Sequence, residues 1–386
     1  MWKGVVGRLL VILIGTIPMA GCGSNEVRVE LEGLEGRGVR VWVRSKVAVD
    51  TNSVISGDMV FRDAEDGEWV AKVVTNNFLE EQHIMVESKP FRGVRSYKFS
   101  FRVPPEPKFN PKGTIVFTTN RDGDRNWEIY AVNVDGSGLR NLSRSPEGSD
   151  IEPAWSPDGK RIAFVSDRND FLNQDIYVMD ADGSNQFRLT QEEAKDYDPA
   201  WSPDGKRIAF VSERSGRAQI YVMNSDGTGL RCLSDGTASD RSPAWSPDGK
   251  RIAFVSDRYS TERWGNDDIF VMNSDGTGVV RLTEHPGYDL DPQWSPDGKY
   301  ILFTSSRDGG EEIYLMKADG SCKMRLTVTE DIYEWTPVWS PDGLGMAFTM
   351  GRGEDYDIWI MDRGGREARK VLDDPYDNRH LSWRPY

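Results

Sequence analysis

Cysteine, histidine and net positive charge are all scarce in this chain of 386 residues. Its 3 Cys and 3 His are too few for a disulfide framework and leave little room for a His-rich metal centre. The 48 Lys and Arg stand against 62 Asp and Glu, a formal charge of −14. This balance argues against a nucleic-acid-binding protein, because phosphate contacts need clustered cations. Apolar residues make up 38% of the chain, enough for a sizeable core.

Hydrophobic runs long enough to cross a membrane are also missing. The N-terminal run at residues 9–17 is well short of the about 20 residues that a spanning helix needs. It follows Lys3 and Arg8 and precedes small residues, a pattern typical of an export signal. Residues 19–22 read Met-Ala-Gly-Cys, which resembles the lipobox of bacterial lipoproteins. We therefore expect a signal peptide at 1–21, a lipid on Cys22 and a tether at 22–25; the alternative is an ordinary signal with an incidental cysteine.

A five-residue motif recurs through most of the chain. Trp-Ser-Pro-Asp-Gly occurs five times, with its Trp at 155, 201, 245, 294 and 339, and weakened copies stand at 109–113 and 382–385. Within one unit, strands are predicted at 152–155, 160–166, 175–179 and 187–190, separated by turns rich in Asp, Pro and Gly. Four strands in about 45 residues are typical of a β-propeller blade. The units predict an all-β, six-bladed propeller over residues 109–386.

The two ends of the repeat region complete one blade. The opening copy lacks its Trp, whereas the closing copy has Trp383 but no blade after it. The simplest closure lets residues 380–383 form the inner strand of the blade built from 113–145, which leaves no open sheet edge. A buried Trp removes about 150–250 Å² from water. We therefore assign the repeated Trp to the core between blades; carbohydrate stacking is the alternative.

Residues 26–103 form a separate region without the repeat. Apolar and polar residues alternate there, for example at 39–43 and 97–103, which predicts a half-buried antiparallel sheet. About six or seven short strands suit a small immunoglobulin-like β-sandwich. Residues 104–108 are rich in Pro and are predicted to be a stiff linker to the propeller.

The repeat residues resemble the TolB-type, WD-repeat-like propeller family over roughly residues 105–386. The resemblance implies a propeller whose channel mouth binds proteins in the cell envelope. TolB proteins carry an α/β N-terminal domain, which residues 26–103 do not resemble.

Charged residues recur at the predicted channel mouth. An acid stands five residues before each intact Trp, with an acid at the closing copy: Asp150, Asp196, Asp240, Asp289, Glu334 and Asp377. An arginine follows each second strand: Arg121, Arg168, Arg214, Arg258, Arg307 and Arg352. Strand counting places both sets on one face, away from the Asp-Gly turns.

Two interpretations of these charges stay open. One is a ring of Arg–carboxylate bridges that holds the loops, since the guanidinium suits bidentate contacts. The other is an acidic funnel, with free carboxylates that include Glu152, Asp198 and Asp291, for a divalent cation or a basic segment of a partner. The same face carries aromatic residues in its loops, which are typical of binding hot spots: Tyr259, Trp264, Tyr288 and Trp335.

No catalytic signature accompanies the repeats. A Gly-x-Ser-x-Gly elbow is missing, and the Asp-Gly turns lack the glutamate of a calcium loop. We therefore predict a non-enzymatic binding protein, lipid-anchored in the cell envelope and facing the periplasm or exterior, without a cofactor, whose propeller binds a protein partner. The alternatives are a metal-dependent propeller hydrolase or lyase acting on envelope or extracellular glycans, and a structural envelope component.

Overall fold

The chain divides into two compact units, residues 1–108 and 109–386. The structure is a computed structural model that describes residues 109–385 except 124–125, 172, 261–266, 330–331 and 354, together with the backbone of eight strands before residue 109. Within these described residues, no helix is long and apolar enough to cross a bilayer.

The first unit is described only through its strands: β1 (Leu10–Leu13), β2 (Asn25–Glu32), β3 (Arg40–Ser45), β4 (Val54–Asp63), β5 (Gly67–Asn76), β6 (Gln82–Met85), β7 (Glu87–Ser88) and β8 (Lys98–Phe101). Six of them form an antiparallel sheet in the order β1-β2-β3-β4-β5-β7, and β6 pairs with β8. Consecutive strands are neighbours from β1 to β5, as in a meander, and the immunoglobulin-like sandwich stays a prediction. Strand β1 lies within the predicted signal peptide, whereas Cys22 lies outside the described residues.

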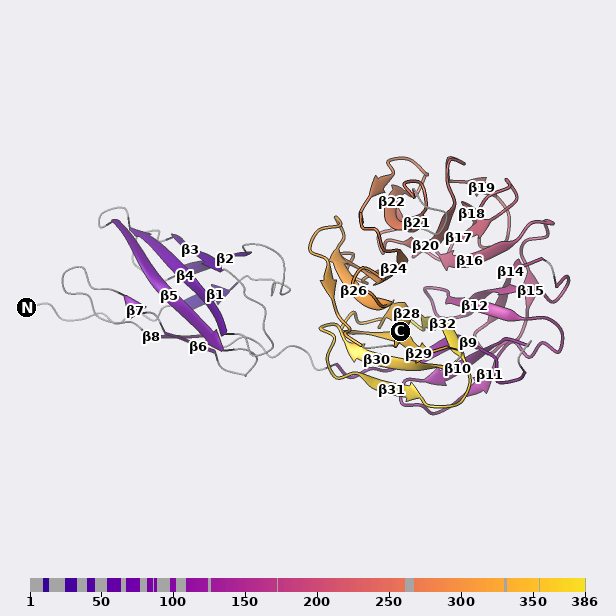
Figure 1. Ribbon diagram of the computed structural model, residues 1–386, viewed down its shortest axis with the longest axis horizontal. Coiled ribbons are helices and arrows are strands. Elements are labelled where there is room, and N and C mark those ends of the chain that lie inside the picture. The colour runs from indigo at the N-terminus through magenta and orange to yellow at the C-terminus, as the bar shows by residue number, and fades with distance from the viewer. Residues whose placement is uncertain are drawn as a thin grey trace, which may run out of the picture. The chain divides into compact units, whose positions relative to one another are not determined.

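The second unit consists of six four-stranded sheets arranged around a central axis (Figure 1). The inner strands are β12 (Asp150–Trp155), β16 (Asp196–Trp201), β20 (Asp240–Trp245), β24 (Asp289–Trp294), β28 (Tyr333–Trp339) and β32 (Asn378–Trp383). The second strands are β9 (Thr114–Thr119), β13 (Arg161–Ser166), β17 (Arg207–Ser212), β21 (Arg251–Ser256), β25 (Tyr300–Ser305) and β29 (Gly345–Arg352). The third strands are β10 (Glu128–Asn133), β14 (Asp175–Asp180), β18 (Gln219–Asn224), β22 (Asp268–Asn273), β26 (Glu312–Lys317) and β30 (Asp355–Asp362). The outer strands are β11 (Arg140–Asn141), β15 (Phe187–Arg188), β19 (Arg231–Cys232), β23 (Val280–Arg281), β27 (Met324–Arg325) and β31 (Arg369–Leu372).

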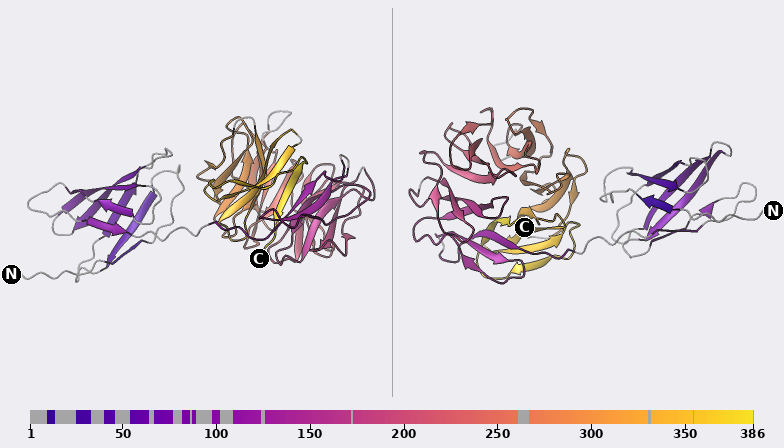
Figure 2. Two further views of the ribbon diagram at one scale, coloured as in Figure 1. Left: turned by 90° about the horizontal axis from the view of Figure 1, so that it is seen from below. Right: turned by 180° about the vertical axis from the view of Figure 1, so that it is seen from behind.

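The C-terminal strand closes the ring. Blade one combines β11, β10 and β9 with β32, and blades two to six follow as β12–β15, β16–β19, β20–β23, β24–β27 and β28–β31. Strand β32 pairs antiparallel with β9, with Asn378 opposite Thr119 and Trp383 opposite Ile115. Each strand runs between the two faces of the propeller (Figure 2). The predicted six blades are therefore confirmed, and the predicted closure is the one that forms.

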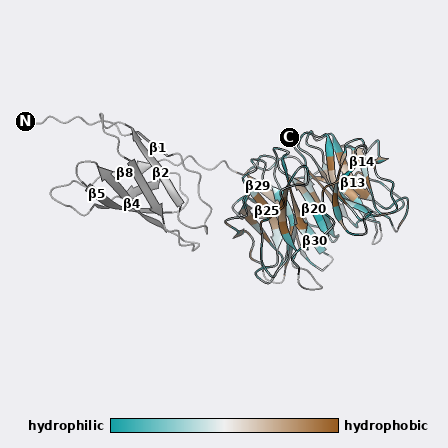
Figure 3. Ribbon diagram, turned by 90° about the horizontal axis from the view of Figure 1, so that it is seen from above, coloured by the Kyte–Doolittle hydropathy of each residue, from teal (hydrophilic) through white to brown (hydrophobic). Residues whose placement is uncertain are grey.

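The repeated Trp side chains lie in the core between neighbouring blades. All six are buried, and hydrophobic residues follow the middle of the blade strands (Figure 3). Trp201 packs with Ala163 and Val178 of blade two, and the guanidinium of Arg161 lies 4.7 Å from the centre of its ring. Arg207 and Trp245 make the same contact at 4.6 Å between the next two blades. These cation–π contacts add to apolar burial in joining one blade to the next.

Candidate binding face of the propeller

The inner strands begin on one face of the propeller, which we call the loop face. The opposite face carries the Asp-Gly turns, and we call it the turn face. In blades two to five, the acid that begins the inner strand lies opposite the serine that ends the second strand, as in the Cα pairs Asp150–Ser166 and Asp289–Ser305. The arginine that follows two residues after each serine is therefore placed at the same edge of the sheet.

Four of the predicted arginines form ion pairs with the acid of their own blade. The pairs are Arg168–Asp150 at 2.7 Å, Arg214–Asp196 at 2.9 Å, Arg258–Asp240 at 3.0 Å and Arg307–Asp289 at 2.8 Å. The acid side chains in these pairs are at most 1% exposed. Buried charges need such partners, so this geometry favours the bridging interpretation for these four blades.

Each paired arginine is held on several sides. The Nε of Arg307 donates to the Ser305 hydroxyl at 2.8 Å, and its guanidinium carbon lies 4.9 Å from the ring centre of Tyr314. In blade two, burial raises the pKa of Asp150, and the Arg168 guanidinium opposes that rise. The same balance acts on the pKa of Asp196 beside Arg214. The arginines are therefore fixed parts of the loop face.

Blade one departs from the predicted pairing. The residue opposite Thr119 is Asn378, so the amide of Asn378 and not the carboxylate of Asp377 takes the place of the acid. Arg121 donates to Asn378 at 3.1 Å and pairs with Asp374 at 2.9 Å. The prediction of Asp377 as the ring member is wrong by one residue, and Asp377 instead pairs with Arg379 at 2.6 Å.

Blade six also departs, because its arginine and its acid do not meet. Strands β29 and β30 are eight residues long instead of six, and the longer ladder places Arg352 opposite Asp355 at an exposed end of the hairpin. Glu334 is fully buried and accepts hydrogen bonds from the hydroxyls of Thr329 at 2.7 Å and Thr327 at 3.5 Å. Burial raises the pKa of Glu334 to about 7.

A second set of buried polar residues was missed by the sequence analysis. Five of them begin the third strands and the sixth, Asp357, is the third residue of β30: Glu128, Asp175, Gln219, Asp268, Glu312 and Asp357. Arg188 pairs with Asp175 at 2.6 Å, and Arg281 pairs with Asp268 at 2.6 Å. The signal for this set is an Asp, Glu or Gln followed by Ile and an aromatic residue, which recurs in all six blades.

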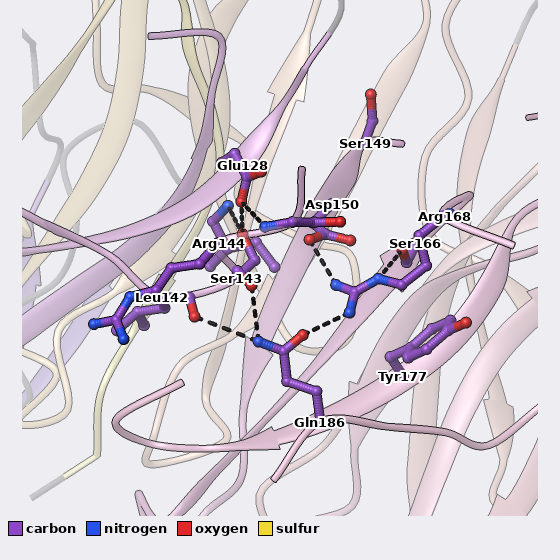
Figure 4. A network of polar contacts seen from close by, with 12 residues as sticks. Glu128, Leu142, Ser143, Arg144, Ser149, Asp150, Ser166, Arg168, Tyr177 and Gln186 are labelled. Atoms are coloured by element: carbon purple, nitrogen blue, oxygen red, sulfur yellow. Dashed lines mark hydrogen bonds and ion pairs between the residues drawn. The ribbon is translucent and has the colours of Figure 1, made fainter. Parts of the chain in front are cut away.

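Hydroxyl groups link this second set to the next blade. Figure 4 shows the Ser143 hydroxyl donating to Glu128 near the Asp150–Arg168 pair. Gln186 joins them, since it accepts from Arg168 at 2.7 Å and donates to the Ser143 carbonyl at 2.9 Å. The polar network therefore connects blades one and two across their interface.

The inner strands also share a bulge near the axis. The residue three positions before each repeated Trp has a positive φ of 49–54°: Glu152, Asp198, Ser242, Asp291, Thr336 and His380. The backbone N–H of Asp198 donates to the Glu152 carboxylate at 2.7 Å, and that of Ser242 donates to Asp198 at 2.9 Å. The carboxylates of Glu152 and Asp198 thus each accept a hydrogen bond from the backbone N–H of the bulge in the next blade.

Burial raises the pKa of all three bulge carboxyls, that of Asp291 to about 6. Repulsion from Asp198 contributes to the raised pKa of both Glu152 and Asp291. Among the residues that the structure describes, no group of three or more Asp, Glu, His or Cys side chains is arranged to hold a metal ion.

Aromatic and apolar side chains add binding character to the loop face. Trp264 lies outside the described residues, whereas Tyr259 is 57% exposed and its ring stacks on Phe270 with centres 5.9 Å apart. Tyr288 and Trp335 stack with centres 6.4 Å apart. Further exposed apolar side chains lie in loops of this face or, for Tyr333, at the start of β28: Phe171, Val328, Ile332, Tyr333 and Tyr376.

Comparison with known families agrees with this geometry. The model of the TolB beta propeller domain matches residues 169–259 and 238–386, which together make up more than half of the chain. The chain belongs to this family. Among curated proteins, the Tol-Pal system protein TolB of Thioalkalivibrio sulfidiphilus is 36% identical over 81 residues, 21% of this chain and 18% of that protein. A TolB homolog of Chlorobium luteolum is 36% identical over 83 residues, 22% of this chain and 18% of that protein. The match thus spans less than a fifth of either relative.

The fold likeness extends further than the sequence likeness. The crystal structure of TolB from Acinetobacter baumannii superposes with a TM-score of 0.62 at 20% identity, covering 85% of this chain and 82% of that one. At this identity the likeness concerns the fold.

Glu334 of blade six has no arginine partner in the part of the chain that the structure describes, and we expect its carboxyl to make the stability of this TolB-family propeller depend on pH. Burial raises the pKa of Glu334 from the ordinary value of 4.5 to about 7, so stability that is present below pH 4.5 is lost as the pH rises through 7. Glu334→Gln mimics the protonated acid and should raise the free energy of unfolding by about 3 kcal/mol at pH 8, with little effect at pH 4.5. Urea denaturation at the two pH values measures this.

A matched control is Glu284→Gln, because the Glu284 side chain is 84% exposed and should change stability little. A loss of stability at pH 8 in Glu334→Gln would contradict the assignment.

Proposed function

We propose that this protein is a cell-envelope binding protein that uses the loop face of its propeller to bind a protein partner. The observation that carries the proposal is the exposure of large apolar side chains on a charged, firmly held surface. Val328 is 78% exposed and Tyr333 is 38% exposed. The stacked pair of Tyr288 and Trp335 lies at the inner strands of blades five and six. Aromatic anchors in such surroundings are typical of binding hot spots.

The rigidity of the loop face supports the same proposal. The Arg–carboxylate pairs hold the ends of the strands from which the loops emerge, so binding costs less ordering of the surface. On the turn face, by contrast, the Asp-Gly turns satisfy their own carboxylates. Asp226 accepts from the Thr228 hydroxyl at 2.6 Å, and Asp275 accepts from Thr277 at 2.6 Å.

The proposal extends to location and domain organisation. A signal peptide at 1–21 and a lipid on Cys22 would place the mature chain on a membrane of the envelope, and residues 26–103 would act as a spacer or second contact, joined by the linker at 104–108. The relative named as a Tol-Pal system protein supports an envelope role. No observation on the described residues favours the glycan hydrolase or lyase alternative.

Affinity capture from detergent-solubilised envelopes tests the binding face. The immobilised full chain is compared with Tyr333→Glu on the loop face and with Thr228→Glu, an exposed position on the turn face. We expect Tyr333→Glu to reduce the captured partner at least tenfold, because it places a charge in an apolar contact, and Thr228→Glu to leave capture within twofold. Equal capture by both variants would contradict the proposal.

A further inference from the structure

We propose that blade six carries a recognition site for an arginine side chain of the partner, with Glu334 as its carboxylate. This inference rests on the proposed function, since it names the chemistry that the loop face recognises. The site consists of Glu334 and the hydroxyls of Thr327 and Thr329, and Tyr333 and Trp335 flank Glu334 along β28.

The other blades show which groups surround the carboxylate that begins the inner strand. In blades two to five a guanidinium lies within 3.0 Å of the acid. It also stacks on rings of the second and third strands, as Arg307 does on Phe303 at 5.4 Å. Blade one has no acid there, because Asn378 replaces it. Glu334 is therefore the one acid at this position, among the described residues, that lacks a guanidinium from its own blade.

Blade six keeps the rest of the arrangement. Phe348 lies opposite Trp359 in the ladder, as Phe303 lies opposite Tyr314 in blade five. The indole Nε1 of Trp359 is buried and has no hydrogen-bond partner. The guanidinium is missing because the longer β29–β30 ladder carries Arg352 outward. The two ring positions are thus retained without the arginine, and the ammonium of Lys370 lies 5.8 Å from the centre of the Trp359 ring.

The donors that now hold Glu334 have other acceptors. The Thr329 hydroxyl also reaches the Ile332 carbonyl at 3.1 Å, and the Thr327 hydroxyl also reaches Glu312 at 2.9 Å. An incoming guanidinium can therefore form an ion pair with Glu334 while both hydroxyls donate to their other acceptors. This keeps the desolvation cost of binding low. Arginine fits better than lysine, because its planar fork matches a carboxylate and stacks on aromatic rings.

The charged groups that face Glu334 come from blade five. Glu312 raises the pKa of Glu334 by repulsion and Arg325 lowers it, and Arg325 is itself ion-paired with Glu312. Arg325 therefore already has a carboxylate of its own blade. Binding of a cation to Glu334 requires the ionised form, so the affinity should fall as pH drops from 8 to 6.

Fluorescence anisotropy with a defined probe tests the site. The probe is a fluorescein-labelled 12-residue peptide of four Gly-Ser-Arg units, compared with the same peptide carrying citrulline, the neutral analogue of arginine. With the full chain at pH 8 we expect the arginine peptide to bind at least tenfold more tightly. Glu334→Gln should weaken it at least tenfold and remove the pH dependence, while Glu284→Gln, with the same change of charge, should alter affinity less than twofold.

Equal weakening by the two Gln variants would overturn the proposal, because it would show attraction by overall charge only. Thermal unfolding of Glu334→Gln checks that the loss is not caused by unfolding. The proposed function is tested separately: if Tyr333→Glu abolishes capture of the envelope partner and Glu334→Gln does not change it, the arginine site fails and the binding face stands. If neither variant changes capture, both fail.

Discussion

Deleting residues 375–386 is expected to abolish cooperative folding of the propeller. The deletion removes β32, the inner strand of blade one. It also removes Trp383 from a core that contains Ile115, Phe117 and Ile360. Burial of one Trp contributes about 4–6 kcal/mol at about 25 cal/mol per Å², which is comparable with the total stability of about 5–15 kcal/mol of a typical protein.

Several contacts across the closure are lost at the same time. The indole of Trp383 donates to the Lys112 carbonyl at 2.9 Å, and the Ser382 hydroxyl accepts from the backbone N–H of Trp155 at 3.0 Å. The exposed edge of β9 would then be open to pairing with other chains. Circular dichroism and calorimetry should show no cooperative transition for the truncated chain.

A circular permutant provides the control for this deletion. Residues 375–383 are placed before residue 113 and joined to it through a Ser-Pro-Asp-Gly turn, which follows the Trp directly as in the other blades. Because Trp383 lies opposite Ile115, a tight turn can join the two strands, and the permutant should unfold near the temperature of the native chain. A truncated chain that melts at the native temperature would show that β32 does not close the ring.

Asp196→Asn is expected to lower the free energy of unfolding by about 3–5 kcal/mol, the usual cost of removing one partner of a buried ion pair. Arg214 would keep its charge with a side chain only 16% exposed, and its other carboxylate, Glu192, lies 3.9 Å away at an exposed position. Urea denaturation at pH 7.5 measures the change.

A double-mutant cycle isolates the interaction energy between Asp196 and Arg214 from the other effects of each substitution. Arg214→Met removes the charge while keeping much of the stem, and the double variant should lose less stability than the sum of the two single variants. A cost below 1 kcal/mol for Asp196→Asn would show that the pair does not hold the loop face.

The fold could be predicted because the same local chemistry is repeated. The Pro-Asp-Gly turn fixes the hairpin between inner and second strands, and its Trp marks where each blade meets the next. The lone Trp383 at the end of the chain even predicted the closure with β9. Because the copies of the repeat can be compared with one another, the blades can be assigned from this one sequence.

The exceptions could not be predicted because they depend on register. The one-residue difference between Asp377 and Asn378, and the longer hairpin that carries Arg352 away from Glu334, appear only when the strands are paired. The link from the Gln186 side-chain amide to the Ser143 carbonyl of the neighbouring blade was also missed, since the two residues are 43 positions apart. The candidate arginine site thus arises from a departure from the repeat.

Hydrogen–deuterium exchange on the full chain, with and without the partner captured from envelopes, tests the binding face most directly. The account predicts slower exchange on binding in the loop-face segments 286–289 and 327–335, and no change in the turn-face segments 225–229 and 274–278. Protection confined to the turn face would contradict it.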